Sequence, residues 1–118
     1  MKKLRSLILM SLIAIACFSL TFTPPAWAAE TPDGAQIFAQ NCASCHANGG
    51  NIIRRGKNLH KRALKWHKKD SVSAITALVK QGKYAMPAYG DRLSAQQIEA
   101  VAVYVLKQAE NDWQSTAD

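Results

Sequence analysis

The apolar residues of the chain fall into short helical repeats that alternate with polar, glycine-rich or proline-containing segments. The first such repeat after residue 30 contains Ile37 and Phe38, and Asp33 can cap the short helix that they predict. This helix is expected to end at Asn41 and Cys42. The segment that carries the chemistry of the chain therefore begins at a helix end.

A loop and a basic helix are predicted next. A Gly-Gly pair flanked by asparagines, residues 48–51, disfavours any regular element. The following residues, 57–67, show a helical period. There Leu59, Ala63 and Trp66 recur at positions i, i+4 and i+7, which predicts a modest helix with a basic outer face.

Two longer helices complete the pattern. Asp70 is expected to cap one of them and Gly82 to end it, whereas Ser94 and Gln97 form a capping-box pair that opens the other. Their apolar faces are Val72, Ile75 and Val79 in the first helix, and Ile98, Val101 and Val105 in the second. Residues 84–91 between them have no helical period and are predicted to form a loop. No strand pattern or internal repeat occurs, so the chain is expected to be all-α.

The N-terminus has the layout of a secretory signal peptide. Basic residues at positions 2, 3 and 5 precede an uncharged, mostly apolar run over 6–22, which two prolines close. An A-x-A pattern at 26–28 predicts cleavage after Ala28, with Ala29 as the neighbouring alternative. The expected organisation is a signal peptide over 1–28 and one domain over 29–118. A membrane-spanning helix and lipidation of Cys17 are alternatives, although the run is shorter than the about 20 residues that span a bilayer.

Cysteine usage indicates a cofactor. Cys17 leaves with the signal peptide, so the exported domain keeps Cys42 and Cys45, too few and too close for a disulfide framework. A domain of this size is only marginally able to hold a fold with its own core. We therefore expect a bound cofactor to stabilise it.

The positive charge is concentrated in one segment. Cleavage removes three basic residues and lowers the formal net charge from +7 to +4, which alone does not indicate nucleic-acid binding. Eight basic residues and no Asp or Glu lie within 54–69: Arg54, Arg55, Lys57, Lys61, Arg62, Lys65, Lys68 and Lys69. The segment is either a solvated helix face or a docking surface for an acidic partner, for which Lys61, Arg62 and Lys65 are the candidate contacts.

Cys42, Cys45 and His46 form the pattern C-x-x-C-H, the signature of covalent haem attachment. Two thiols three positions apart on a helical turn can each form a thioether with a haem vinyl group, and the next residue can ligate the iron. A zinc or dithiol site is the alternative. Zinc would need two more ligands, and His60 and His67 are spaced too widely for the usual pattern; a dithiol motif does not require the histidine.

Met86 is the candidate for the sixth position of the iron. It is the methionine that remains after cleavage, and the adjacent Pro87 favours an extended, stiff backbone in the predicted loop. A Met/His ligand pair suits electron transfer, whereas a peroxidase would need an open iron position. In the alternative, Met86 fills a gap in the core and His60 or His67 is the distal ligand.

The chain resembles cytochrome c6, the class I cytochrome of cyanobacterial and algal photosynthesis, over nearly all of its exported part. The matching segments are GAQIF at 34–38, NCASCH at 41–46, SAIT at 73–76, GK at 82–83, AMPAY at 85–89, RLS at 92–94, YVL at 104–106 and QAE at 108–110. A near-terminal tryptophan, Trp113, follows, as in the family.

The resemblance implies a small cytochrome c fold of about four helices around one haem c, with His46 and Met86 as iron ligands. It also implies a thylakoid-lumen or periplasmic carrier between cytochrome f of the cytochrome b6f complex and photosystem I. Arg92 stands where the family has an arginine that helps docking, although Asp91 precedes it where glycine is usual.

One departure from the family concerns the acceptor. Leu78 replaces the family's glutamine in the helix before the methionine loop, as in c6-like variants, so another acceptor such as a terminal oxidase is the alternative. A monomeric one-electron carrier that is not an enzyme, binds no nucleic acid and stays out of the membrane after cleavage is the leading hypothesis. A haem peroxidase and a fixed subunit of a larger complex are the competing ones.

Overall fold

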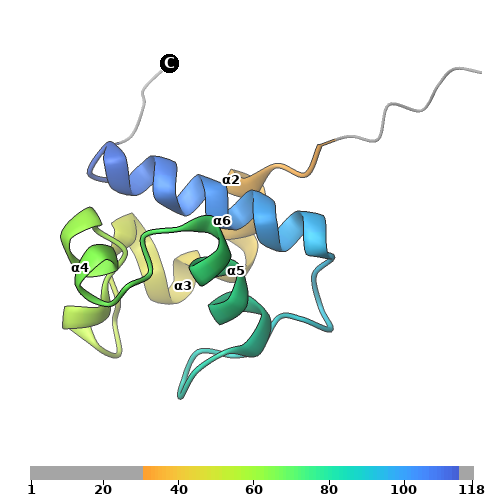
Figure 1. Cartoon of the computed structure of the whole chain (residues 1–118), viewed down its shortest axis with the longest axis horizontal. Helices are drawn as coiled ribbons and strands as arrows, with labels where there is room; N and C mark the ends of the chain where they lie inside the picture. Colours follow the sequence, from red (N-terminus) through yellow and green to blue (C-terminus); the bar gives the residue numbers. More distant parts are fainter. Residues whose placement is uncertain (1–30, 115–118) are drawn as a thin grey trace, which may run out of the picture. The chain divides into compact units, whose positions relative to one another are not determined.

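The computed structural model describes residues 31–114, so the predicted signal peptide over 1–28 and the last four residues lie outside the described part. The α-helices are α2 (Gly34–Asn41), α3 (Ala43–His46), α4 (Lys61–Trp66), α5 (Val72–Gln81) and α6 (Ala95–Glu110), and two 3-10 turns are η1 (Ala47–Gly49) and η2 (Arg55–Lys57) (Figure 1). Within residues 31–114 the only β-type pairing is an isolated bridge between Lys83 and Met86. The all-α prediction is confirmed, with five α-helices in this described part when the single turn α3 is counted, where about four were expected.

Capping residues set the starts of the first and last helices as predicted. The Asp33 carboxylate accepts a hydrogen bond of 2.9 Å from the amide of Ala35. At α6, the Ser94 hydroxyl accepts from the Gln97 amide at 3.1 Å, and the Gln97 side chain accepts from the Ser94 amide at 2.9 Å. This reciprocal capping box satisfies two amides that would otherwise lack partners.

The start of α5 differs from the prediction by one residue. Ser71, and not Asp70, is the N-cap, because its extended backbone (φ −138°, ψ 152°) brings its hydroxyl within 3.2 Å of the Ala74 amide. A cap side chain must reach the second or third amide of the helix, and Asp70 lies one position too early for that. The end of α5 is as expected: Gly82 has φ 67°, and its amide donates to the Leu78 carbonyl at 2.8 Å.

The basic helix is shorter than its sequence pattern predicted. The period covered residues 57–67, but α4 comprises only Lys61–Trp66. Asn58 is the reason, because its side chain accepts from the His60 amide at 3.1 Å and donates to the Arg55 carbonyl at 2.9 Å. Such local side-chain bonds compete with helix formation, so the chain before α4 is a turn.

The buried face of α4 also differs from the predicted one. Leu64 is buried, with 5% of its surface exposed, whereas Trp66 is 83% exposed. Leu59 and Ala63, the other two predicted positions, are half-buried. The shorter α4 therefore turns a different face to the core from the one that the period predicted.

The core lies where α6 crosses α2 and α5 (Figure 1). Its buried residues are Ile37, Phe38, Leu64, Ile75, Val79, Tyr89, Ile98, Val101, Ala102, Val105 and Ala109. The α2–α6 crossing is close, because a Cβ on Gly34 would collide with the Ala100 carbonyl. In the described part of the chain no helix is long and apolar enough to cross a bilayer.

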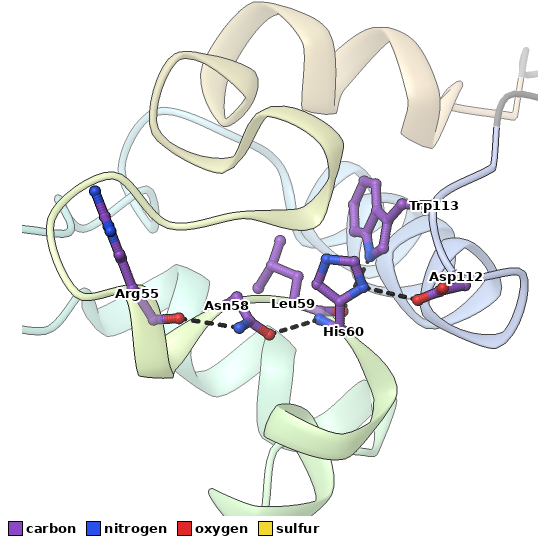
Figure 2. A network of polar contacts seen from close by, with 6 residues as sticks. All are labelled: Arg55, Asn58, Leu59, His60, Asp112 and Trp113. Atoms are coloured by element: carbon purple, nitrogen blue, oxygen red, sulfur yellow. Dashed lines mark hydrogen bonds and ion pairs between the residues drawn. The ribbon is translucent and has the colours of Figure 1, made fainter.

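The end of α6 ties the segment before α4 to the core. Figure 2 shows the Trp113 indole N–H donating to the Leu59 carbonyl at 3.0 Å and the His60 ring donating from Nδ1 to the Asp112 carboxylate at 2.9 Å. The Trp113 ring also packs against Phe38, with ring centroids 5.1 Å apart. The near-terminal tryptophan therefore joins three parts of the fold.

Candidate functional site

The C-x-x-C-H segment forms one helical turn at the junction of α2 and α3. Cys42 ends α2, and its carbonyl accepts from the amides of Cys45 at 3.1 Å and of His46 at 2.9 Å. Cys42 is half-buried and Cys45 is exposed, and both are free thiols. The turn thus presents two thiols and an imidazole from neighbouring positions, as covalent haem attachment requires.

A backbone carbonyl orients the imidazole of His46. Its Nδ1 lies 2.8 Å from the Gly50 carbonyl oxygen. Because a carbonyl can only accept, Nδ1 carries the proton, and the neutral ring keeps the lone pair of Nε2 for a metal. Metal-binding histidines usually donate their other ring N–H to an acceptor such as a backbone carbonyl. Such a bond fixes both the tautomer and the orientation of the ring. The sequence did not identify Gly50, because any residue type can offer its carbonyl.

The alternative chemistries of the two thiols are disfavoured. Burial raises the pKa of the Cys42 thiol to about 11, whereas redox-active dithiols have lowered pKa values. Across residues 31–114, no group of three or more His, Cys, Asp or Glu side chains is arranged to hold a metal ion. A zinc site and a dithiol site both lack support.

Met86 closes a tight turn in the loop after α5. The Lys83 amide donates to the Met86 carbonyl at 3.0 Å, and the Met86 amide donates back to the Lys83 carbonyl at 3.1 Å. The Met86 side chain is half-buried and packs against the core cluster, as does Cys42. The predicted loop therefore exists, and its methionine reaches the same core as the haem-attachment motif.

Tyr89 connects this loop to the motif, a role that no pattern in the sequence predicts. Its hydroxyl donates to the Asn41 carbonyl at 2.8 Å, directly before Cys42, and only 7% of Tyr89 is exposed. Burial raises the pKa of the Tyr89 phenol above its ordinary value, and the two thiols add to this, whereas the nearby Arg92 opposes it. One hydrogen bond thus fixes the methionine loop against the end of α2.

The two other histidines have partners away from the motif. His60 bonds to Asp112, and the Nε2 of His67 lies 3.1 Å from the Gly56 carbonyl. Both histidines lie within the basic segment, residues 54–69. These contacts disfavour either ring as a distal iron ligand.

The candidate docking residues fall into two separate places. Arg92 lies just before α6, where its guanidinium stacks 4.9 Å from the centre of the Tyr89 ring. Lys61 lies near the other end of α6, where it pairs with Glu110. A helix of 16 residues is about 24 Å long, so these two groups belong to different patches.

The remaining two candidates on α4 are available to a partner. Arg62 and Lys65 are exposed, and neither makes an ion pair within the described residues. Lys61 is partly neutralised by its pairing with Glu110. The free charge of the α4 patch therefore lies mainly on Arg62 and Lys65.

The donor set fits a haem of c type. It combines two free thiols on one turn, a histidine whose Nε2 is left free, and a thioether in a half-buried turn. Ile52 and Ile53, which follow the motif loop, are 67% and 62% exposed, and the Ile52 amide bonds to the Cys45 carbonyl at 3.1 Å. Large apolar side chains on the surface beside the motif suit a flat apolar group.

Known proteins with similar sequences agree with this geometry. Residues 29–105 match the family model described as cytochrome C oxidase, cbb3-type, subunit III. Over 113 residues, the chain is 52% identical to the protein named cytochrome c6-like from Nostoc sp. (strain PCC 7120), covering 96% of this chain and 99% of that protein. The cytochrome c6 of the same strain is 49% identical with the same coverage.

The chain belongs to the cytochrome c6 family. Its cofactor is a c-type haem, attached covalently through the C-x-x-C-H motif, and the family consists of electron carriers. Among solved structures, cytochrome c6C from Synechococcus sp. PCC 7002 is similar, with 60% identity and a TM-score of 0.66, covering 68% of this chain and 98% of that one. This member of the cytochrome c6 family therefore has the predicted fold class.

Proposed function

We propose that this cytochrome c6 homologue shuttles single electrons from cytochrome f of the cytochrome b6f complex to photosystem I, and that Cys42 and Cys45 bind its haem. The observation that carries the proposal is the His46–Gly50 hydrogen bond, which leaves Nε2 as a ready axial ligand. The bound haem supplies one reversible electron at its iron. The described residues hold and orient it.

Met86 is the proposed second axial ligand. Its turn is closed by two backbone hydrogen bonds, and Tyr89 anchors the loop beside the motif, so the backbone that carries the thioether is attached at both places. A thioether and an imidazole together leave no open position for substrate, which favours a carrier over a peroxidase. We therefore propose that the protein is not an enzyme.

Residues 1–28 are proposed to direct export as a signal peptide, and residues 29–118 to act in the thylakoid lumen or periplasm. The order of basic, apolar and small residues supports this assignment. N-terminal sequencing of the protein secreted by its host tests it. A mature chain that starts at Ala29 or Glu30 is expected, whereas an uncleaved Met1 contradicts export by this route.

A c6-like carrier with another acceptor, such as a terminal oxidase, is the second candidate. Leu78 on α5 supports it, because a half-buried leucine stands where the resemblance gives a glutamine. The high identity to the c6-like protein of Nostoc is in line with this candidate. The two candidates share the site and differ in reduction potential and partner.

Spectroscopy and kinetics on the purified holoprotein test the proposal. We expect haem that resists acid-acetone extraction, a low-spin spectrum, and a sulfur-to-iron charge-transfer band that disappears in Met86→Ala. Rates of reduction by cytochrome f, and of oxidation by photosystem I or by oxidase-containing membranes, then separate the two candidates. An unchanged charge-transfer band in Met86→Ala contradicts the ligand assignment.

Charge reversal tests the docking surfaces. Glutamate at Lys61, Arg62 and Lys65 is expected to slow transfer with an acidic partner at low ionic strength, and less so at 0.15 M, where screening acts over about 8 Å. Arg92→Glu tests the second patch separately. Lys107→Glu on α6 changes the net charge by the same amount as Arg92→Glu and is its matched control. Equal rates for the triple variant and the parent at low salt reduce the α4 patch to a solvated face.

A further inference from the structure

Tyr84 has a backbone conformation that its residue type disfavours. It occupies the first central position of the turn from Lys83 to Met86, with φ 54°, the only positive φ among residues 83–86. A positive φ at this position alone is typical of a type II′ turn, in which glycine is preferred. A bulky residue held there is strained, and such strain persists only where surrounding contacts impose it.

The contacts around the Tyr84 ring are cationic. Arg54 Cζ, Lys57 Nζ and Lys83 Nζ lie 5.4, 6.0 and 5.6 Å from the ring centroid. All three distances are within the range of cation–π attraction. Lys83 belongs to the same turn, but Arg54 directly precedes η2 and Lys57 is the last residue of η2, ahead of α4. The ring therefore links the methionine turn to a different segment.

The rest of the loop is attached to α5. The Gly82 amide bonds to the Leu78 carbonyl at 2.8 Å, and the Tyr89 amide bonds to the Val79 carbonyl at 2.9 Å. The tip between these anchors is solvent-exposed, and 80% of Tyr84 is accessible. Among the hydrogen bonds, ion pairs and aromatic contacts of residues 31–114, those of the Tyr84 ring with Arg54 and Lys57 join this tip to segment 54–57.

We propose that Tyr84 is a positioning residue, a cation–aromatic latch that holds the Met86 turn against segment 54–57 and slows its opening. When the turn opens, the Met86 sulfur leaves the iron and a small nitrogen ligand can replace it. The latch thus controls the lifetime of the axial bond. The inference rests on the proposed ligation by Met86.

Imidazole binding to the ferric holoprotein measures this opening, because the added ligand enters only after Met86 departs. Tyr84→Leu keeps a bulky side chain at the positive φ and removes the aromatic face, whereas Tyr84→Phe keeps the face and removes only the hydroxyl. We expect imidazole to bind roughly 5-fold to 30-fold faster to the leucine variant, from the loss of two exposed cation–π contacts between segments. The phenylalanine variant should match the parent.

Hydrogen exchange gives a readout that does not depend on added ligand. The Met86 amide donates to the Lys83 carbonyl, so its exchange reports opening of the turn itself. In Tyr84→Leu this amide should exchange faster by a similar factor, whereas the Gly82 amide on α5 should keep the parent rate. Faster exchange at both amides would indicate general destabilisation and would overturn the latch.

A double-mutant cycle tests whether the cations act through the ring. The double variant with Arg54→Gln and Lys57→Gln should speed imidazole binding as much as Tyr84→Leu does, and the combined variant should show no further increase. Independent, multiplying effects contradict the latch, as do equal rates in the parent, leucine and phenylalanine proteins. A parent without the sulfur-to-iron band overturns both this inference and the ligand assignment, whereas a parent with the band and no Tyr84 effect overturns the inference alone.

Discussion

Tyr89→Phe should lower the stability of the protein in a way that depends on pH. The substitution removes the hydroxyl that donates to the Asn41 carbonyl at 2.8 Å and keeps the ring in the core. A neutral hydrogen bond contributes about 0.5–1.5 kcal/mol net, and a buried carbonyl left without a donor adds to the loss. Since Asn41 is only half-buried and water can partly replace the donor, we expect a loss of about 1–2 kcal/mol at pH 7.

The difference should shrink in alkali. Burial holds the pKa of the Tyr89 phenol above its unfolded value of about 10, and this cause persists when the two cysteines are uncharged thioethers. A raised folded-state pKa leaves the free energy of unfolding unaffected below pH 10 and lowers it as the pH rises from there through the folded-state pKa. The phenylalanine variant has no phenol at this position. Parent and variant should therefore converge above about pH 10.

Guanidinium unfolding of the holoproteins between pH 7 and 11, followed by far-ultraviolet circular dichroism, measures both effects. Tyr84→Phe is the matched control, because it removes an exposed hydroxyl and should change stability by no more than about 0.5 kcal/mol at pH 7. Equal stability of Tyr89→Phe and the parent at neutral pH would refute the stabilising role of the hydroxyl. A difference that stays constant from pH 7 to 11 would refute the raised pKa of the Tyr89 phenol.

Three further substitutions test other parts of the structure. Trp113→Phe removes the indole bond to the Leu59 carbonyl and should cost about 1 kcal/mol in thermal unfolding. Gly82→Ala should cost at least about 1 kcal/mol and weaken the sulfur-to-iron band, because φ is 67° and a Cβ there would lie 2.7 Å from the Met86 carbonyl oxygen. Leu78→Gln should raise the reduction potential with both axial ligands retained; equal potentials in one buffer would refute this.

Local signals in the sequence were sufficient for most helix boundaries. Asp33, Ser94 with Gln97, and Gly82 act at the positions that capping rules assign to them. The apolar periods of α5 and α6 correctly predicted which face of each helix is buried. Both helices are long enough for the apolar residues to recur on one face. Ser71 was missed because two capping residue types stand side by side, and only the backbone decides which side chain reaches the helix amides.

The rest of the site depends on contacts between distant segments, which a local pattern does not contain. The motif gave the candidate thiols and histidine directly, but the carbonyl of Gly50, the Tyr89–Asn41 bond and the ring of Tyr84 depend on how the loops fold back. The basic helix was predicted too long for a local reason. The apolar period over 57–67 is present in the sequence, but the side chain of Asn58 forms a turn that shortens the helix.

The distribution of the core suits a haem that is attached covalently at the end of α2. Buried side chains concentrate on α2, α5 and α6, whereas α3 is a single turn and the residues around Ile52 and Ile53 are largely exposed. A one-turn helix cannot hold its own conformation, and exposed loops are the parts of a protein that open most easily. Bonds from Cys42 and Cys45 would attach the cofactor at the end of α2, one of the helices that contain most of the buried side chains. On the proposed ligation by Met86, the weaker elements would open locally while the cofactor stays attached, so loop residues would tune the lifetime of the Met86 turn and not the retention of the haem.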